Sequence, residues 1–313
     1  MFKYILKRVA ASVVTLLLVA AITFLAMNAI PGNPFLDENT TVEQMEIANA
    51  KYGLDQPLLV QMKNYLLNYL HGDMGESLKM QRGTPVKDII FGQGKFELSI
   101  QLGVLALFLT VLMGIPLGCI AAYNRGKTVD NFLNVFSTVG IAAPNFVVAT
   151  LLLTLLSVKL GILPAVSGSF DDPKAIIMPA IALSLYYVCY VAKLTRTSML
   201  DAINQDYIRT ARAKGLRTGS LIFKHALRNA LIPVVTYLGP LTAGLLCGGF
   251  VVETTFGVPG LGRYFVSSII DRDYPIIMAT TIVLSTLIIG MNLIVDIVYK
   301  IVDPRISLSG TNN

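Results

Sequence analysis

Few side chains in this sequence could form the centre of a chemical reaction. The chain has two histidines, His71 and His225, which are too few and too far apart for a catalytic triad or a zinc site. The run from Gly92 to Lys95 lacks the glycine spacing and the hydroxyl of a phosphate-binding loop. No nucleophile-elbow or zinc-protease motif occurs in the sequence. We therefore expect a chain that is not an enzyme and that binds no cofactor or metal itself.

The cysteines offer no further chemistry. Cys119, Cys189 and Cys247 are three in number, have no close spacing and all lie in apolar runs. A disulfide framework or a metal site would require paired or clustered cysteines. They are expected to be small, apolar core residues.

The segment that most needs a function is Asp201 to Pro233, a basic stretch between long apolar runs. Asp206 could accept hydrogen bonds from the free N–H groups of a first helical turn, so we expect a helix over 207–214. Gly215 follows where a left-handed residue would close that helix. A helix of two turns is marginal by itself in water, so it needs either its own bundle or a partner. We interpret it as a docking element.

The two faces of this short helix differ in character. Ile208 and Ala211 are three residues apart and share one face, while Arg209 and Arg212 share the neighbouring face. An apolar face beside a basic one suits a helix that binds another protein.

The residues of this segment resemble a known family. The strings Tyr207 to Leu216 and Lys224 to Pro233 are similar to the cytoplasmic loop of ATP-binding-cassette (ABC) importer permeases, in particular the first of two permease subunits in the oligopeptide/dipeptide/nickel group. The Glu-Ala-Ala triplet of generic importers falls on 209–211, where this chain has Arg, Thr and Ala, and Gly215 is in place. The strings Pro31 to Pro34 and Gly72 to Ser77 also resemble this group, so the likeness covers nearly the whole chain.

The resemblance implies a mechanism with several partners. Two different six-span permeases would form one pore, and two cytoplasmic ATPases carrying ATP and Mg²⁺ would dock on the 207–215 helix. An extracytoplasmic solute-binding protein would deliver peptide, and the pore would alternate between outward and inward access. The implied ATPase-coupling residues are Tyr207, Ile208, Arg209, Ala211, Arg212, Ala213, Lys214, Gly215 and Leu216.

The elements that would position this segment are apolar helices. The chain is 54% hydrophobic and 14% charged, with a mean hydropathy of +0.65, which is typical of a multi-span membrane protein. A first span is expected at residues 9–30, which is longer than the apolar core of a cleaved signal peptide. Five more are expected at about 96–122, 132–157, 175–196, 230–252 and 275–299. The fold class is thus all-α and polytopic, and by resemblance a type I importer permease.

Gly114 and Gly118 in the second run permit close helix packing.

The charges predict the orientation of these spans. With both termini cytoplasmic, the inner segments hold 15 basic and five acidic residues, as the positive-inside rule requires. The positive net charge of the chain is therefore explained by its membrane topology, and a nucleic-acid partner is not needed to explain it. A prokaryotic plasma membrane is the expected location.

We expect three regions along the chain. Residues 1–30 form the cytoplasmic N-terminus and first span, 31–95 an extracytoplasmic helical segment, and 96–313 the core membrane domain with its coupling loop at 201–229. Within 31–95, amphipathic helices are expected over Val42 to Tyr52 and Leu58 to Leu70. They form either a small cap on the membrane domain or a contact surface for an outer binding protein.

The outer loop between the last two spans is rich in glycine. An ordered turn dipping toward the bilayer is expected there. It either lines the outer end of the substrate path or acts as a rigid connector, and Glu253 either faces that path or extends to the outer surface. The candidates are Glu253, Phe256, Pro259, Gly260 and Leu261.

Other functional classes stay open at this stage. A transporter or channel driven by an ion gradient would require ionisable residues near mid-membrane or inverted repeats of broken helices. An assembly protein without transport would leave the long basic loop unexplained. The sequence does not select among dipeptides, longer peptides, nickel chelates or haem as cargo.

Overall fold

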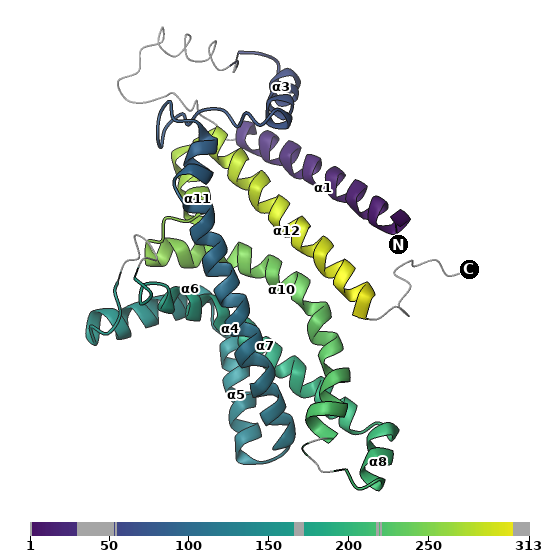
Figure 1. The fold of residues 1–313 in the computed structure, drawn as a ribbon. Coiled ribbons are helices and arrows are strands. Elements are labelled where there is room, and N and C mark those ends of the chain that lie inside the picture. Colours follow the sequence, from purple (N-terminus) through teal and green to yellow (C-terminus); the bar gives the residue numbers. More distant parts are fainter. Residues whose placement is uncertain are drawn as a thin grey trace. The chain divides into compact units, whose positions relative to one another are not determined.

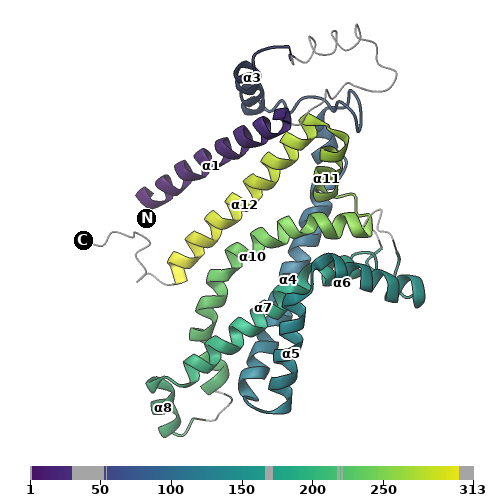
Figure 2. The ribbon, with the colours of Figure 1, turned by 180° about the vertical axis from the view of Figure 1, so that it is seen from behind.

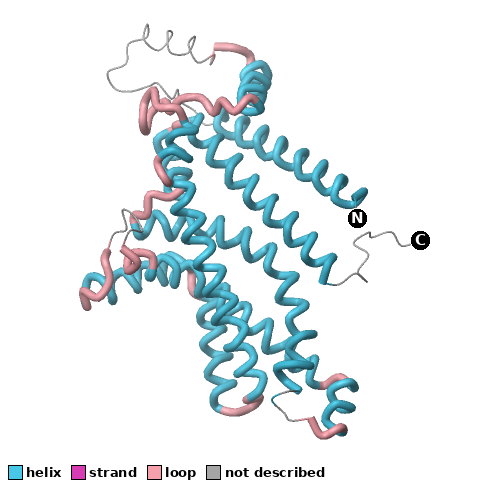
Figure 3. The backbone as a smooth tube through the Cα atoms, in the orientation of Figure 1, coloured by secondary structure: helices cyan, strands magenta, loops and turns pink. Residues whose placement is uncertain are grey.

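The chain folds as a set of helices. The computed structural model describes residues 2–29, 53, 55–165, 172–216, 219 and 221–302 (Figure 1). Within this part of the chain no strand occurs, and an isolated bridge joins Glu76 to Pro85 (Figure 3). The expected all-α fold is confirmed. The helix expected over Val42 to Tyr52, the motif at Pro31 to Pro34 and the side chain of Cys247 lie outside the described residues.

Five helices are long and apolar enough to cross a membrane. The candidate spans are Leu6–Ala29, Lys95–Tyr123, Ile177–Ile203, Leu227–Phe256 and Tyr274–Ile294. They match five of the six expected spans. They belong to helices α1 (Phe2–Ala29), α4 (Lys95–Tyr123), α7 (Ile177–Ile203), α10 (Leu227–Phe256) and α12 (Tyr274–Val302).

The remaining expected span, 132–157, is broken in two. Helix α5 (Thr128–Ala142) meets the stretch formed by α6 (Asn145–Leu152) and the π-helical η2 (Leu153–Lys159) at 103°. Ala143 is extended because it precedes Pro144, whose ring disfavours helical geometry at the residue before it. Each arm of 15 residues is only about 22 Å long, short of the roughly 30 Å hydrocarbon core. The pair is thus one broken span or a re-entrant element.

The chain divides into two compact units. One comprises residues 1–99 and 259–289, and the other residues 100–258 and 290–313. The first contains α1, α3 (Leu58–Leu70), the π-helical η1 (Asp88–Gly92), α11 (Leu261–Asp271) and the first part of α12. The second contains most of α4, then α5 to α7, α8 (Asp206–Ala213), the π-helical η3 (Leu221–Ala226) and α10.

In the first unit, α1 lies alongside α12, as two opposite views show (Figures 1 and 2). A narrow stripe of α1, Ala20, Phe24 and Met27, packs on Ile277 and Met278. Most of the remaining surface of α1 exposes large apolar side chains. This is the pattern of a helix that faces lipid or another membrane helix rather than water.

Helix α3 confirms the expectation for residues 58–70. It begins after Pro57, whose carbonyl accepts hydrogen bonds from the N–H groups of Val60 and Gln61. Of its apolar residues, Met62 and Leu66 pack on the cluster formed by α1 and α12, whereas Leu59 and Leu70 are 71% and 80% exposed. Burial raises the pKa of Tyr65 and of Tyr69, whose rings stack on each other along this helix.

In the second unit, α7 is the central helix. It is the most buried of the candidate spans, and neighbouring helices approach it through glycines. A Cβ added at Gly118 of α4 would lie 2.5 Å from the carbonyl oxygen of Ala192, and one added at Gly114 would lie 2.9 Å from Val191. The close packing expected at these two glycines is confirmed. Cys119 and Cys189 are free and buried at 4% and 1% exposure, as expected of small core residues.

Candidate functional site

Helix α8 lies within the segment expected to dock a partner. It spans Asp206–Ala213, and the extended residue before it is Gln205, which makes no side-chain capping bond. The predicted cap at Asp206 is therefore wrong by one residue. Asp206 lies in the first turn instead, where its carboxylate accepts a hydrogen bond from Arg209 at 3.4 Å. The predicted closure is confirmed, because Gly215 has a φ of +78° and its N–H bonds to the carbonyl of Arg212.

The apolar face of α8 is turned toward the chain itself. Ile208 is 2% exposed and belongs to a cluster with Met199, Leu221 and Ala230 from other parts of the same unit. Ala211 packs against the same cluster. The helix is therefore held by its own bundle, the first of the two alternatives. Ile208 is an anchor for α8 and is not available for contact with another protein.

The opposite face of α8 is open and basic. The exposed residues of the motif are Tyr207, Arg209, Arg212, Ala213, Lys214, Gly215 and Leu216. Beside them lies a cleft of about 380 Å³, lined by polar groups of Ser198, Asp201, Gln205 and Asn229 together with Tyr207, Ala202 and Pro233. This arrangement offers a convex basic helix with a polar hollow next to it, which suits contact with a protein surface.

The end of α10 differs from the expectation for the outer loop. Glu253 is 2% exposed and Phe256 1% exposed, so both side chains lie in the interior of their unit. Of the two alternatives for Glu253, extension to the outer surface is therefore wrong. The expected ordered turn is confirmed, because Gly257 adopts φ +70° and the N–H of Val258 bonds to the carbonyl of Glu253 at 2.9 Å.

The second half of the same loop starts α11. Gly260 is the extended residue before the helix, and Leu261 is fully buried. The N–H of Leu261 donates to Ser99 Oγ at 2.8 Å. Pro259 is partly exposed. Each of these residues has a fixed place in its unit.

Asp273 is a structural centre that no sequence pattern indicated. Its buried carboxylate accepts hydrogen bonds from Ser77 Oγ at 2.6 Å and from three backbone N–H groups, those of Leu78, Lys79 and Met80, at 3.0 to 3.2 Å. The motif ending at Ser77 was marked for its resemblance alone. The structure gives it a role, which is to bind the start of α12.

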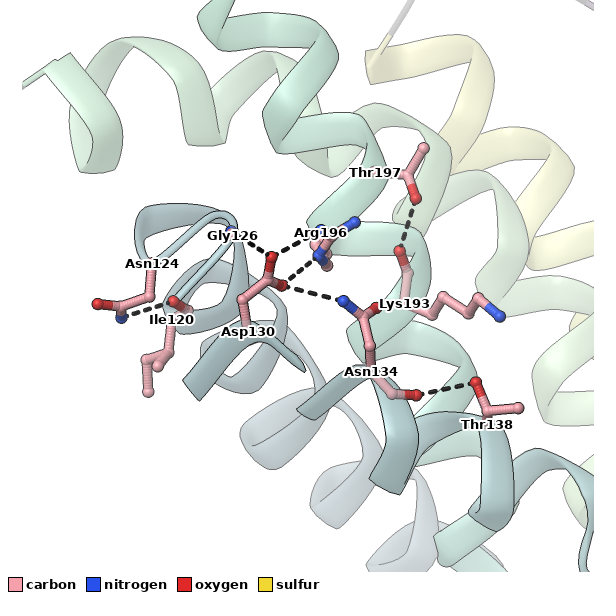
Figure 4. A network of polar contacts seen from close by, with 9 residues as sticks. All are labelled: Ile120, Asn124, Gly126, Asp130, Asn134, Thr138, Lys193, Arg196 and Thr197. Carbon is pink, nitrogen blue, oxygen red and sulfur yellow. Dashed lines mark hydrogen bonds and ion pairs between the residues drawn. The ribbon is translucent and has the colours of Figure 1, made fainter. Parts of the chain in front are cut away.

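An ion pair joins α5 to α7 (Figure 4). Arg196 donates from Nε and Nη2 to the two carboxylate oxygens of Asp130, at 2.6 and 2.9 Å. The backbone N–H of Gly126 and the side-chain amide of Asn134 complete the shell around that carboxylate. These two charges had been counted only as topology signals. Their spacing in sequence gives no sign that they meet.

Within the described residues, no group of three or more His, Cys, Asp or Glu side chains lies close enough to hold a metal ion. The features that the structure does bring together are apolar spans, a broken helix pair, and one exposed basic helix braced by the chain's own core. This combination is that of a multi-span membrane protein with a basic helix exposed on its surface.

Family models identify the class. Residues 114–308 match the model described as "Binding-protein-dependent transport system inner membrane component", and residues 1–85 match its N-terminal companion. The chain belongs to this family. It is a multi-pass protein of a prokaryotic inner membrane.

Individual relatives are similar over their whole length. The chain is 42% identical over 309 residues to the dipeptide transport system permease protein DppB of Bacillus subtilis strain 168, covering 98% of this chain and 99% of the relative. It is 39% identical over 308 residues to the oligopeptide transport system permease protein OppB of Salmonella typhimurium, with the same coverage.

Solved structures show the same fold. A chain of the inward-facing MetNI methionine ABC transporter matches with a TM-score of 0.57 at 16% identity, covering 68% of this chain and 96% of that one. A chain of an amino acid ABC transporter crystallised with histidines matches with a TM-score of 0.51 at 18% identity, covering 68% and 93%. The fold of ABC importer permeases is thereby confirmed.

Proposed function

We propose that this chain is one of two permease subunits of a peptide importer of the ABC class. It forms half of the translocation path, takes peptide from an extracytoplasmic binding protein, and is driven by two cytoplasmic ATPases that bind ATP and Mg²⁺. The chain itself is not catalytic. The observation that carries the proposal is similarity along the full chain to permeases named for dipeptide and oligopeptide transport.

The structure supports α8 as the ATPase-coupling element. Its exposed basic face and the adjoining polar cleft are free to receive a protein surface, while Ile208 fixes the helix to the core that contains Met199 of α7. A push on α8 would therefore be transmitted to α7 through packed side chains. Because packed cores respond by rearranging between discrete states, nucleotide-driven movement of α8 can switch access to the path.

We extend the proposal to the outer loop. Glu253, Phe256, Pro259, Gly260 and Leu261 border the outer end of the path, with Phe256 and Leu261 as its buried supports.

The docking face can be tested separately from the fold. Leu216→Asp changes a residue that is 39% exposed, so the chain should reach the membrane in normal amount but lose its ATPases on affinity purification in mild detergent. Ile208→Asp should instead reduce the amount of folded chain, because it buries a charge in an apolar cluster. Measurements are chain abundance, co-purified subunits and peptide-stimulated ATP hydrolysis.

Asn204→Ala serves as the matched control, since Asn204 is exposed just before α8 and outside the motif. It should retain the ATPases. If Leu216→Asp also retains them with full hydrolysis, this face is not the docking site. If the unaltered chain purifies as a homo-oligomer with no ATPase, the importer function itself is refuted and a gradient-driven transporter becomes the better hypothesis.

Gly215, which closes α8, offers a graded test of the proposed transmission from α8 to α7. A Cβ at Gly215 would meet no atom within 4 Å, so a side chain there costs only backbone strain at φ +78°. That strain is about 1 kcal/mol or more for most residues, less for asparagine and greatest for β-branched ones. We expect uptake of labelled peptide to fall in the order Gly, Asn, Ala, Val, with chain abundance unchanged. Full uptake by Gly215→Val would exclude a mechanical role for this closure.

A further inference from the structure

A group of tyrosines lies within two spans of the second unit, halfway along α7 and about a third of the way along α10. Tyr190 of α7 stacks on Tyr237 of α10 with ring centroids 4.3 Å apart and planes inclined by 26°. Tyr186, one turn earlier on α7, continues the stack at 6.4 Å from Tyr190. Tyr187 meets Tyr186 edge to face and packs against Gly244 of α10, which brings the two helices close together. The rings are therefore braced on both helices.

Their depth in the membrane is unusual for tyrosine. Tyr190 is the middle residue of the 27-residue helix α7, about 20 Å from either end. Membrane tyrosines normally lie at the two interfaces, where the hydroxyl reaches water. Tyr186, Tyr190 and Tyr237 are each partly exposed, and no hydrogen bond joins their hydroxyls to any other described residue. Hydroxyls in hydrocarbon without a partner would be costly, so this surface calls for a polar occupant.

The adjoining backbone of α10 adds another acceptor. Pro240 has no N–H, so the carbonyl of Thr236, next to Tyr237, has no partner four residues on. Pro233, one turn before Tyr237, likewise cannot donate to the carbonyl of Asn229. Both prolines are exposed. The surface therefore presents ring faces, phenolic hydroxyls and a carbonyl that lacks its usual α-helical donor, and the four residues that form it carry no charge.

We propose that Tyr186, Tyr190, Tyr237 and the carbonyl of Thr236 form a peptide-contact surface inside the translocation path. The inference rests on the proposed function and identifies where that function is carried out. A peptide has a constant backbone with amide N–H and C=O groups, which suit the hydroxyls and the carbonyl of Thr236. Its variable side chains would meet only aromatic faces, which accept many shapes without demanding a particular charge. The surface thus fits a transporter that must pass peptides of differing sequence.

The test uses the complete complex, with its ATPases and binding protein, in vesicles. The three native cysteines are first replaced by alanine, and Tyr237→Cys is then treated with the charged thiol reagent 2-sulfonatoethyl methanethiosulfonate. We expect modification, slowed at least about 2-fold during ATP-driven turnover with trialanine-loaded binding protein. Tyr123→Cys is the control, because Tyr123 is 57% exposed at the end of α4 and outside the cluster. It should be modified at a rate that peptide does not change.

Two substitutions measure the hydroxyls themselves. Tyr190→Phe and Tyr237→Phe keep the stack and remove one hydroxyl each, so trialanine uptake should fall roughly 2- to 10-fold, the range for one lost hydrogen bond. Tyr123→Phe should have no effect. Lack of modification at Tyr237→Cys would place this surface against lipid or the second permease, and modification without peptide protection would refute peptide contact. If the unaltered complex takes up no peptide, the proposed function fails rather than this surface alone.

Discussion

Removing the carboxylate of Asp273 is expected to destabilise the first unit more than any other single polar substitution in it. In Asp273→Ala, the Ser77 hydroxyl and the N–H groups of Leu78, Lys79 and Met80 lose their acceptor together. Ser77 and Leu78 are 1% and 5% exposed, so water cannot readily replace the carboxylate there. At about 1–3 kcal/mol for each buried group left unsatisfied, the loss should be about 3 kcal/mol or more.

The stability of Asp273→Asn should lie between that of the unaltered chain and that of Asp273→Ala. Oδ2 accepts from Ser77, Lys79 and Met80, and an amide oxygen can take over this position, whereas the amide nitrogen would face the N–H of Leu78. Asp271→Ala, two residues away and exposed, is the matched control. Because the chain has no tryptophan, unfolding is best followed by size-exclusion chromatography of a fluorescent-protein fusion after heating. Equal stability of Asp273→Ala and Asp271→Ala would show that the carboxylate does not hold this loop.

The sequence could predict those features that depend on local patterns. Apolar runs of 20 or more residues define spans by length alone, and the five continuous spans follow from them. Gly215 was predictable because a left-handed closure favours glycine whatever surrounds it. The break in the run 132–157 was not, since a stretch can remain apolar while turning through 103°. Pro144 was its one local sign.

Features that depend on distant partners could not be read from the sequence. Asp273 and Ser77 are 196 residues apart, and Asp130 and Arg196 are 66 residues apart, with no periodicity that relates them. The direction in which Ile208 points was equally hidden, because it depends on Met199 and Ala230 rather than on α8. Burial of Glu253 likewise follows from packing. An amphipathic helix shows that it has two faces but not which one is covered.

The ion pair between Asp130 and Arg196 is expected to be the most costly polar contact to break in the second unit. Asp130 is 2% exposed and Arg196 22%, and two parallel hydrogen bonds join them. Removing one partner of a buried pair typically costs about 3–5 kcal/mol, because the other charge is left uncompensated. Arg196 is partly exposed, so Asp130→Asn and Arg196→Gln should lie toward the lower end of that range.

The double substitution separates pairing from general damage. With Asn and Gln together neither charge remains, so Asp130→Asn with Arg196→Gln should lose less stability than the two single changes summed, and the difference measures the pair. Lys193→Gln is the control, since Lys193 is exposed one turn before Arg196 on α7. Heated samples of the same fluorescent fusion give the stabilities, and peptide uptake shows whether α5 and α7 must stay joined during transport. Strict additivity, or single variants as stable as the Lys193 control, would mean that the contact in Figure 4 contributes nothing to the fold.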